Sequence, residues 1–323
     1  MNVAFPLCRE PSHEEAIRRV LEACVAFLTD RLPSPALRAV VLTGSFARGE
    51  GTVLPVDGQL RILGDIEFLV ILGRDVDYRT IRRRCAQWGR EAAATVGGAR
   101  VRLDVEFGPV GTGYLTHRAR PSIFVYDLAR HGKVVWGPPD LLERLAPFPA
   151  ARIPKEDALF LLFNRTVEQV EAWDRLATAD GEALLDVAYQ RLKLVLDLAG
   201  SALAFAGNHT PSYQRRPLAF ANLVAETPSL QALLPAGFQG DLERAACAKV
   251  SPAGSDIALV RRLPPDAQRA ELAAQIVAAV PAVAAFLRWE LEQLLGAGGD
   301  LPALLERYLA TQPLSRRARD WAK

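Results

Sequence analysis

Two short segments of this chain repeat one pattern, in which a single apolar residue separates two carboxylates: Asp65-Ile66-Glu67 and Asp104-Val105-Glu106. On a β-strand, residues i and i+2 point to the same face of the sheet. Each segment therefore predicts a strand that aims both carboxylates at one place, while its central apolar residue enters the core. The pattern requires a sheet with a core on one side and an acidic face on the other.

Clustered carboxylates repel one another and resist ionising together, and a divalent cation relieves that conflict. A hard cation such as Mg²⁺ prefers oxygen ligands together with substrate phosphates. A solvated sheet face is the alternative, because Arg102 shares its face with Asp104 and Glu106. The apolar residues 68–72 that come after Glu67 favour a buried strand, and hence a cation or a catalytic role for its acids.

A glycine-rich turn comes after the apolar run at residues 39–43. Residues 44–51 hold Gly44, Gly49 and Gly51, so the chain is expected to bend sharply there. Backbone N–H groups and the Ser45 hydroxyl in such a turn are suited to bind phosphate. For Arg48 two roles stay open, a further positive charge on that phosphate or a solvated side chain.

The remaining pattern predicts the α+β class, with a small mixed-sheet domain over residues 1–150 and a helical-bundle domain over residues 151–323. A helix is expected over residues 12–32, with Ser12 as its N-cap and Glu15 three places on. Asp57-Gly58 predicts a hairpin over residues 53–63. Helices are also expected over residues 78–96, 182–206, 240–249, 266–296 and 301–310, and strands over residues 65–72 and 100–107. One helix face is expected to carry Leu159, Leu162, Phe163, Val167, Val170 and Trp173.

Composition restricts the function classes. The chain has 323 residues and a formal net charge of +2, so no strong overall field points to nucleic acid or membrane. The four cysteines show no metal-ligand spacing, which is typical of reduced thiols in a cytoplasmic protein. The longest apolar run, residues 272–287, contains Gln275 and Pro281 and favours a buried helix over a membrane span. The basic tail at residues 316–319 is expected to be solvated, with contact to a polyanion as the alternative.

Taken in order, a strand, Gly44-Ser45 with Arg48 and Gly49, a strand with Asp65-x-Glu67 and a later strand with Asp104 resemble the DNA polymerase β-type nucleotidyltransferase superfamily. A small α/β domain followed by helices is similar to the bacterial aminoglycoside-type members, and residues 126–137 resemble the segment that lies just after their catalytic core. The resemblance covers roughly residues 36 to 140. Two departures are the long gap between Ser45 and Asp65, attributed to an inserted hairpin, and Asp-x-Glu in place of the commoner Asp-x-Asp.

The resemblance implies a reaction in which an acceptor hydroxyl attacks the α-phosphate of a nucleoside triphosphate and pyrophosphate leaves. Asp65, Glu67 and Asp104 would be the catalytic residues and would hold two Mg²⁺ ions, with Mn²⁺ as an alternative. Asp104 or Glu106 would accept the proton of the acceptor. Gly44, Ser45, Arg48 and Lys193 would bind the triphosphate.

Several side chains keep two interpretations. Asp186, Gln190, Lys193 and Asp197 recur on one helix stripe, which is typical of a solvated face; the alternative is that the stripe faces a cleft and Lys193 reaches the triphosphate. The histidines show no ligand spacing and are expected to be structural or exposed: His13, His117, His131 and His209. Tyr213, Arg215 and Arg216 are candidates for an acceptor pocket.

Three functions stay open. The first is transfer of AMP from ATP to a small hydroxylated molecule, which the modest net charge favours. The second is the same chemistry on tRNA, a protein side chain or a second nucleotide, although no basic, aromatic-lined groove is visible in the sequence. The third is a catalytically inactive nucleotide-binding or antitoxin-like module, which would be expected to lose a carboxylate. The sequence leaves the oligomeric state open.

Overall fold

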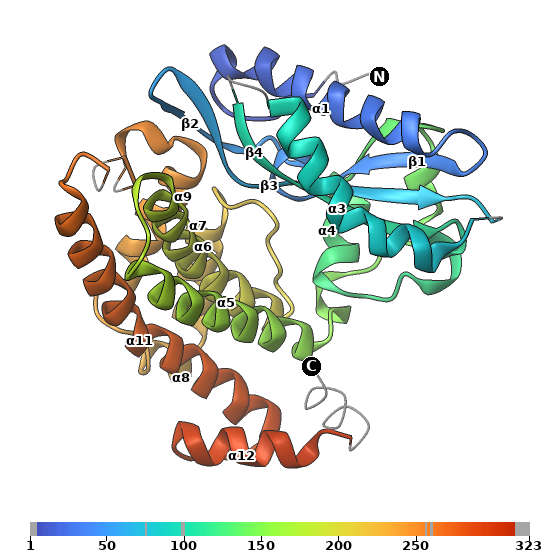
Figure 1. Cartoon of the computed structure of the whole chain (residues 1–323). Helices are drawn as coiled ribbons and strands as arrows, with labels where there is room; N and C mark the ends of the chain where they lie inside the picture. The colour runs from blue at the N-terminus through green and yellow to red at the C-terminus, as the bar shows by residue number, and fades with distance from the viewer. Residues whose placement is uncertain (1–4, 75, 98–100, 256, 259–260, 314–323) are drawn as a thin grey trace.

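The computed structural model describes residues 5–74, 76–97, 101–255, 257–258 and 261–313, and it confirms the α+β class. A mixed five-stranded sheet with its helices forms the first part, and helices form the second (Figure 1). Strand β4 runs parallel to β3, and the other pairings are antiparallel. The first part contains α1 (Pro11–Arg31), β1 (Leu37–Leu42), α2 (Gly44–Ala47), β2 (Thr52–Val56), β3 (Gln59–Leu72), α3 (Tyr78–Gly97), β4 (Val101–Gly111), α4 (Ile123–His131) and β5 (Lys133–Trp136).

The predicted hairpin exists, but it is not a separate insertion. Its second arm and the strand of Asp65 are one strand, β3, which pairs with β2 through residues 59–63 and with β1 through residues 68–72. Asp57, at a φ of 51°, and Gly58, at 80°, form the turn. The long gap between Ser45 and Asp65 is therefore filled by a continuous extension of the central strand.

A bulge beside Gly64 sets the register of the acidic residues. Between the pairs Arg61–Arg102 and Asp65–Asp104, β3 advances four residues while β4 advances two. Gly64 has a φ of 84°, and a Cβ there would lie 2.9 Å from the Tyr189 hydroxyl oxygen. Glycine meets both demands, because it tolerates positive φ and leaves room for the tyrosine. The bulge brings Asp65 opposite Asp104 and Glu67 opposite Glu106.

The N-terminal helix begins differently from the prediction. Its N-cap is Glu10, Pro11 occupies the first turn, and Ser12 lies inside the helix without capping it. Pro11 suits the first turn because it has no N–H to satisfy. The Glu14 carboxylate instead accepts hydrogen bonds from the backbone N–H groups of Leu7 and Cys8.

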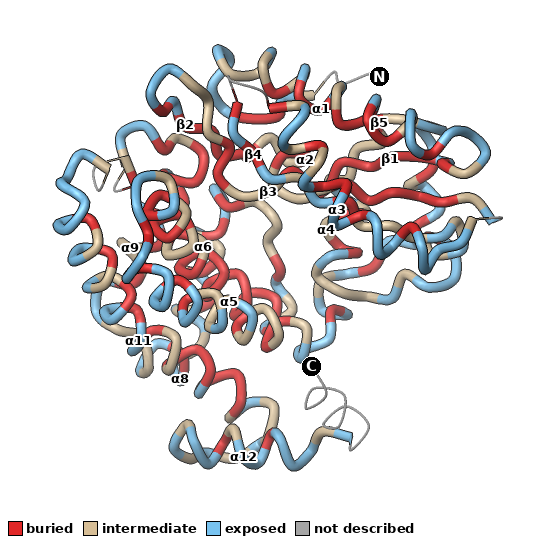
Figure 2. Tube along the Cα trace, in the orientation of Figure 1, coloured by how far each residue is buried: buried red, intermediate tan, exposed pale blue. Residues whose placement is uncertain are grey.

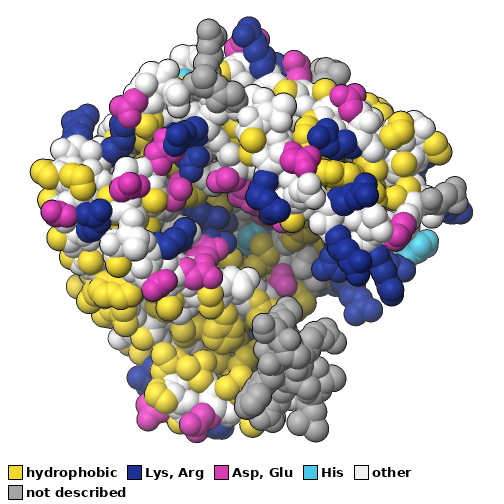
Figure 3. Space-filling model, in the orientation of Figure 1, with side chains coloured by type: hydrophobic (Ala, Val, Ile, Leu, Met, Phe, Trp, Pro, Cys, Tyr) yellow, Lys and Arg dark blue, Asp and Glu magenta, His cyan; other side chains and the backbone are white. Residues whose placement is uncertain are grey.

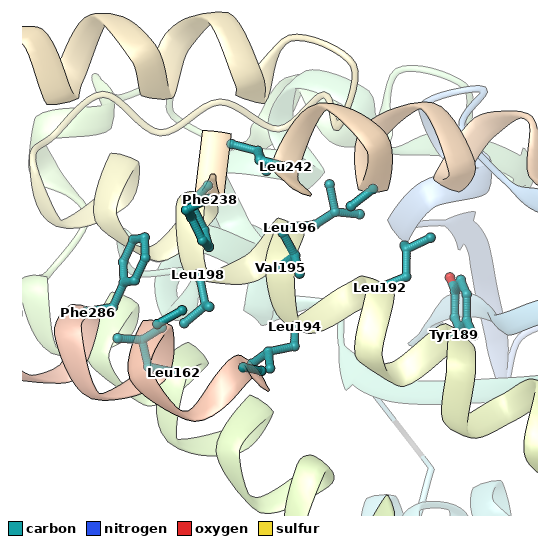
Figure 4. Close-up of a cluster of buried hydrophobic side chains, with 14 of the residues drawn as sticks. Leu162, Tyr189, Leu192, Leu194, Val195, Leu196, Leu198, Phe238, Leu242 and Phe286 are labelled. Atoms are coloured by element: carbon teal, nitrogen blue, oxygen red, sulfur yellow. The ribbon is translucent and has the colours of Figure 1, made fainter. Parts of the chain in front are cut away.

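Among its described residues, the second part contains the expected helices and also α7 and the single-turn α8. Its apolar core surrounds α6, whose faces are buried almost throughout (Figures 2 and 4). The face predicted on α5 is only half correct, because Leu159 and Leu162 are buried whereas Val167, Val170 and Trp173 are exposed. The helices are α5 (Lys155–Leu176), α6 (Gly181–Phe205), α7 (Arg216–Glu226), α8 (Pro228–Gln231), α9 (Phe238–Val250), α11 (Pro265–Leu295) and α12 (Leu301–Thr311).

The apolar run at residues 272–287 lies in α11, which continues through Pro281. In the described part of the chain, this helix alone is long and apolar enough to cross a membrane by length and composition. It packs against α5, α6 and α12, and 39% of its most apolar window is buried. The prediction of a buried helix is thus confirmed for one face. The four cysteines are free thiols, and the basic tail at 316–319 lies outside the described residues.

Candidate active site

A cavity of about 370 Å³ lies between the two parts of the molecule. The sheet part contributes Asp65 and Glu67 of β3 and the turn from Thr43 to Arg48, and α4, α5 and α6 close the other sides. Figure 3 shows a hollow at the centre of this face, with acidic and basic side chains along it. The sequence-predicted residues Gly44, Ser45, Arg48, Asp65, Glu67 and Lys193 all line this cavity.

The turn from Thr43 to Arg48 packs directly on Glu67. Gly44 has a φ of 66°, and a Cβ on it would lie 2.5 Å from Glu67 Oε2. The Thr43 N–H donates to the Glu67 carbonyl oxygen at 2.9 Å, and the Thr43 hydroxyl lies 3.4 Å from Glu67 Oε2. The positive φ favours glycine at position 44, and any side chain there would also have to displace the Glu67 carboxylate.

The acidic residues of β3 and β4 form one electrostatic group. Burial, followed by the negative charges of Asp65 and Glu106, raises the pKa of Glu67 to about 7, against the opposing charges of Lys193 and Arg48. Partial burial, the charge of Asp65 and a hydrogen bond with Asp65 raise the pKa of Glu106. Partial burial also raises the pKa of Asp104, which Arg61 opposes and Asp186 and Asp65 reinforce. Mutual repulsion of this kind is what a divalent cation relieves.

The two acids of β4 occupy different positions. The charges of Asp65 and Lys193 act on Glu106, whereas Asp104 lies under the influence of Arg61, which is itself ion-paired with Asp186 at 2.8 Å. Both β4 acids are exposed, and neither lines the cavity. Within the described residues, no group of three or more His, Cys, Asp or Glu side chains is arranged as a complete metal site. Asp65 and Glu67, with Glu106 adjoining, could hold a cation only if that cation took its other oxygens from a substrate phosphate.

Arg48 is buried rather than solvated. Its side chain is 7% exposed, and it pairs with Asp127 of α4 at 3.2 Å and with Glu50 at 3.5 Å. Burial opposes ionisation of Asp127, but the hydrogen bond with His209 at 2.8 Å and the charges of His209 and Arg48 outweigh it and lower its pKa. The turn is thereby fixed to α4 and to the loop that carries His209.

The stripe on α6 faces the cavity, so the interpretation as a solvated face is wrong for Lys193 and Asp197. Asp197 is 5% exposed and pairs with Arg216 at 3.0 Å and with Arg165 at 3.1 Å. Lys193 acts on Glu67 and Glu106 through its charge, yet it forms no ion pair within the described part of the chain. Its ammonium group is therefore available for an anionic ligand.

Sequence reasoning missed several lining residues or gave them no role. Tyr189, Arg165 and Lys249 were given no role, and His209 was expected to be structural or exposed. Asp127 belongs to the segment 126–137 that carried the family resemblance, but it too was given no role. Tyr213 and Arg216 do line the cavity, as guessed, while Arg215 lines a second, adjoining cavity of about 1160 Å³. Arg48, His131 and His209 border both cavities. For Lys193 the signal was the apolar stretch of α6 that follows it, because a lysine inside so buried a helix has to reach a polar space.

No family model and no curated protein matches the sequence. A comparison of solved structures finds similarity to spectinomycin adenyltransferase AAD(9) from Enterococcus faecialis with ATP and spectinomycin. The TM-score is 0.38 at 15% identity, and the match covers 81% of this chain and 98% of that chain. The assignment of function therefore rests on the geometry of the site.

Proposed function

We propose that this chain is a metal-dependent nucleotidyltransferase, which moves a nucleoside monophosphate from a nucleoside triphosphate, with ATP as the expected donor, to a hydroxyl of a small molecule. The observation that carries the proposal is the placement of Asp65 and Glu67 against the Gly44 turn, in a cavity that Lys193 also lines. Mutually repelling carboxylates beside a turn and an ammonium group match a ligand that brings both a cation and phosphates.

Each group has a definite task in this proposal. Asp65 and Glu67 hold Mg²⁺, which when bound would neutralise developing charge on the attacking and leaving oxygens. The turn at Gly44 and Ser45, together with Lys193, binds the β- and γ-phosphates. Arg48 is largely occupied by Asp127 and Glu50 and positions the turn.

Besides Asp65 and Glu67, a third carboxylate, on β4, accepts the proton of the acceptor hydroxyl. Glu106 and Asp104 were both candidates from sequence, and we favour Glu106 because the charge of Lys193, which lines the cavity, acts on it. Asp104, beside Arg61, is favoured less. The acceptor oxygen forms a bond to the α-phosphorus, the bond to the bridging oxygen breaks, and pyrophosphate leaves with that electron pair.

A small acceptor is favoured by the shape of the site. Cavities of several hundred Å³ are typical of small-molecule sites, and the two adjoining cavities provide space for a nucleotide and a second ligand. We further propose that the division near residue 150 separates a nucleotidyltransferase domain from a helical domain, and that the protein is cytoplasmic. Transfer to tRNA, protein or a second nucleotide, and an inactive nucleotide-binding module, are the alternatives.

Two measurements test the proposal. Thermal denaturation with each nucleoside triphosphate, with and without Mg²⁺, should show a rise in Tm that requires both, because a ligand that binds the native state stabilises it. Pyrophosphate release should then be measured over a panel of aminocyclitols, sugars and nucleosides, with Asp65→Asn as the control. Mg²⁺-dependent binding without turnover on any acceptor would favour the inactive module. Unchanged turnover in Asp65→Asn would overturn the site.

A further inference from the structure

Lys249 is a buried lysine that the proposed chemistry does not use. It lies near the end of α9, is 1% exposed, and contributes to the wall of the 370 Å³ cavity. Its Nζ donates to the Glu50 carbonyl oxygen at 3.2 Å and to the Thr52 hydroxyl oxygen at 2.7 Å. The Thr52 hydroxyl in turn donates to the Lys249 carbonyl oxygen at 2.7 Å. These bonds tie α9 to the strand that comes after the Gly44 turn.

The hydrogen bonds of Lys249 suit an amine better than an ammonium ion. A neutral amine has two N–H groups, and both find oxygen acceptors, whereas an ammonium ion has a third. Within the described residues no carboxylate forms an ion pair with Nζ. The groups that act on Nζ are Lys193 and Asp197 of α6, Arg48 and Glu50 beside the turn, and the rings of Tyr189 and Tyr213. Burial, then the positive charges of Lys193 and Arg48, lowers the pKa of Lys249 to about 7.

An anion in the cavity would instead favour the ammonium form of Lys249. A triphosphate beside Lys193 and Arg48 would compensate the two cations that repel Lys249 and would add an attractive charge across a short, poorly screened distance. The third N–H would lie near the faces of Tyr189 and Tyr213, whose centroids are 5.4 and 5.1 Å from Nζ, and aromatic faces stabilise ammonium ions.

We infer that Lys249 is a neutral amine when the cavity is empty and takes up a proton when a nucleoside triphosphate binds. The proton comes from the buffer and forms a third N–H bond on Nζ. Protonation adds positive charge behind the phosphate turn and strengthens the bonds to Glu50 and Thr52, so it positions the turn through these residues. This inference rests on the proposed function, because it requires a triphosphate in the cavity.

Calorimetry of the full chain tests it. Binding of α,β-methylene ATP with Mg²⁺ is measured at about pH 8 in two buffers of different ionisation enthalpy, and the difference in heat gives the number of protons taken up. Wild-type protein is expected to take up about one proton more than Lys249→Met, because at about pH 8 the free protein holds Lys249 largely deprotonated. The same subtraction removes contributions from Glu67 and His131, which both proteins retain. Equal proton numbers in the two proteins would overturn the inference while leaving the proposed function intact.

Two further measurements do not depend on that variant folding. In wild-type protein, ε-carbon NMR signals of ¹³C-labelled lysine should show one lysine that changes from the amine to the ammonium shift when the analogue is added at about pH 8. The association constant should also fall about tenfold per pH unit above about pH 7.5. A lysine signal that is already cationic in the free protein, or a flat affinity profile, would overturn the inference. Failure of wild-type protein to bind either the analogue or inorganic triphosphate would instead overturn the proposed function, and this inference with it.

Discussion

Glu106 lies opposite Glu67 across the β3–β4 pair and is influenced by the charges of Asp65 and Lys193, whereas Asp104, opposite Asp65, is influenced by Arg61. Of the two β4 carboxylates, Glu106 should therefore be the one whose neutralisation slows the reaction more. We expect Glu106→Gln to lower the rate of pyrophosphate release at least about 100-fold and Asp104→Asn to lower it less than about 10-fold. Steady-state kinetics on the two variants measures this, and the reverse order would identify Asp104 as the third carboxylate.

Gly44→Ala should disrupt the site through a collision with Glu67. The new Cβ would lie 2.5 Å from Glu67 Oε2, at a φ of 66° that alanine adopts poorly. Gly58→Ala is the matched control, because Gly58 has a φ of 80° but no described atom within 4 Å of the built Cβ. Both variants should lose about 1–2 kcal/mol of unfolding free energy in urea titrations, and only Gly44→Ala should also lose turnover. Full activity in Gly44→Ala would show that the turn does not depend on Glu67 for its position.

Lys193→Met should weaken triphosphate binding more than it slows the chemical step. Lys193 forms no ion pair in the described residues and faces the carboxylates of the cavity, so its charge is free for the β- and γ-phosphates. We expect KM for the nucleotide to rise about tenfold or more, which corresponds to about 1.4 kcal/mol of lost interaction. Lys155→Met is the control, since Lys155 is exposed at the start of α5 and lies 4.9 Å from the Phe205 ring centroid, outside the cavity lining. Equal KM values for the two variants would exclude Lys193 from phosphate binding.

The buried carboxyl group of Glu290 predicts that the free energy of unfolding depends on pH. Glu290 is fully buried in α11, and burial raises its pKa to about 8 against the opposing hydrogen bond with Ser201. The Ser201 hydroxyl has one proton and donates it to the Ala158 carbonyl oxygen at 2.8 Å. Ser201 Oγ also lies 2.6 Å from Glu290 Oε1, and because its one proton can serve only one of the two acceptors, a protonated Glu290 would satisfy both contacts.

Stability should consequently decline as the pH rises. The folded-state pKa of Glu290 lies above the ordinary value of 4.5, so its contribution is intact below that value and is lost as pH rises to about 8. The loss should be on the order of 4 kcal/mol of unfolding free energy between about pH 4.5 and pH 8. Glu290→Gln preserves a donor to Ser201 without an ionisable group, so it should remove this decline and be the more stable protein at about pH 9. Denaturant titrations over that range measure it, and parallel pH profiles for the two proteins would contradict a neutral Glu290.

Local sequence patterns were sufficient to predict much of the fold and the residues at the centre of the candidate site. Alternation along Arg102, Asp104 and Glu106 predicted the acidic face of β4, and apolar periodicity predicted α1, α3, α6, α9, α11 and α12. It failed where a long-range contact decides the outcome. Ser12 does not cap α1, which begins after Glu10, and Glu14 accepts from Leu7 and Cys8. For Asp197 a solvated and a cleft-facing position both stayed open, because nothing local reveals that Arg165 and Arg216 reach it.

The cavity wall that carries Lys249 and His209 was even harder to predict from the sequence. Lys249 meets Thr52 across 197 residues of sequence, and His209 meets Asp127 across 82. Such pairs carry no spacing that a single sequence displays, because they depend on how the helices dock on the sheet. The placement of Asp65 and Glu67 beside Gly44 was predictable, since β1 and β3 are neighbours and the turn comes directly after β1.

The unbroken course of β3 has a mechanical consequence. Its first half is bonded to β2, which Thr52 anchors to Lys249 on α9, and its second half carries Asp65 and Glu67. One strand, which bends at the Gly64 bulge, thus connects the docked helices to Asp65 and Glu67. Substrates should therefore enter a preassembled chamber, and a wide swing of one half of the molecule over the other should not be needed for turnover.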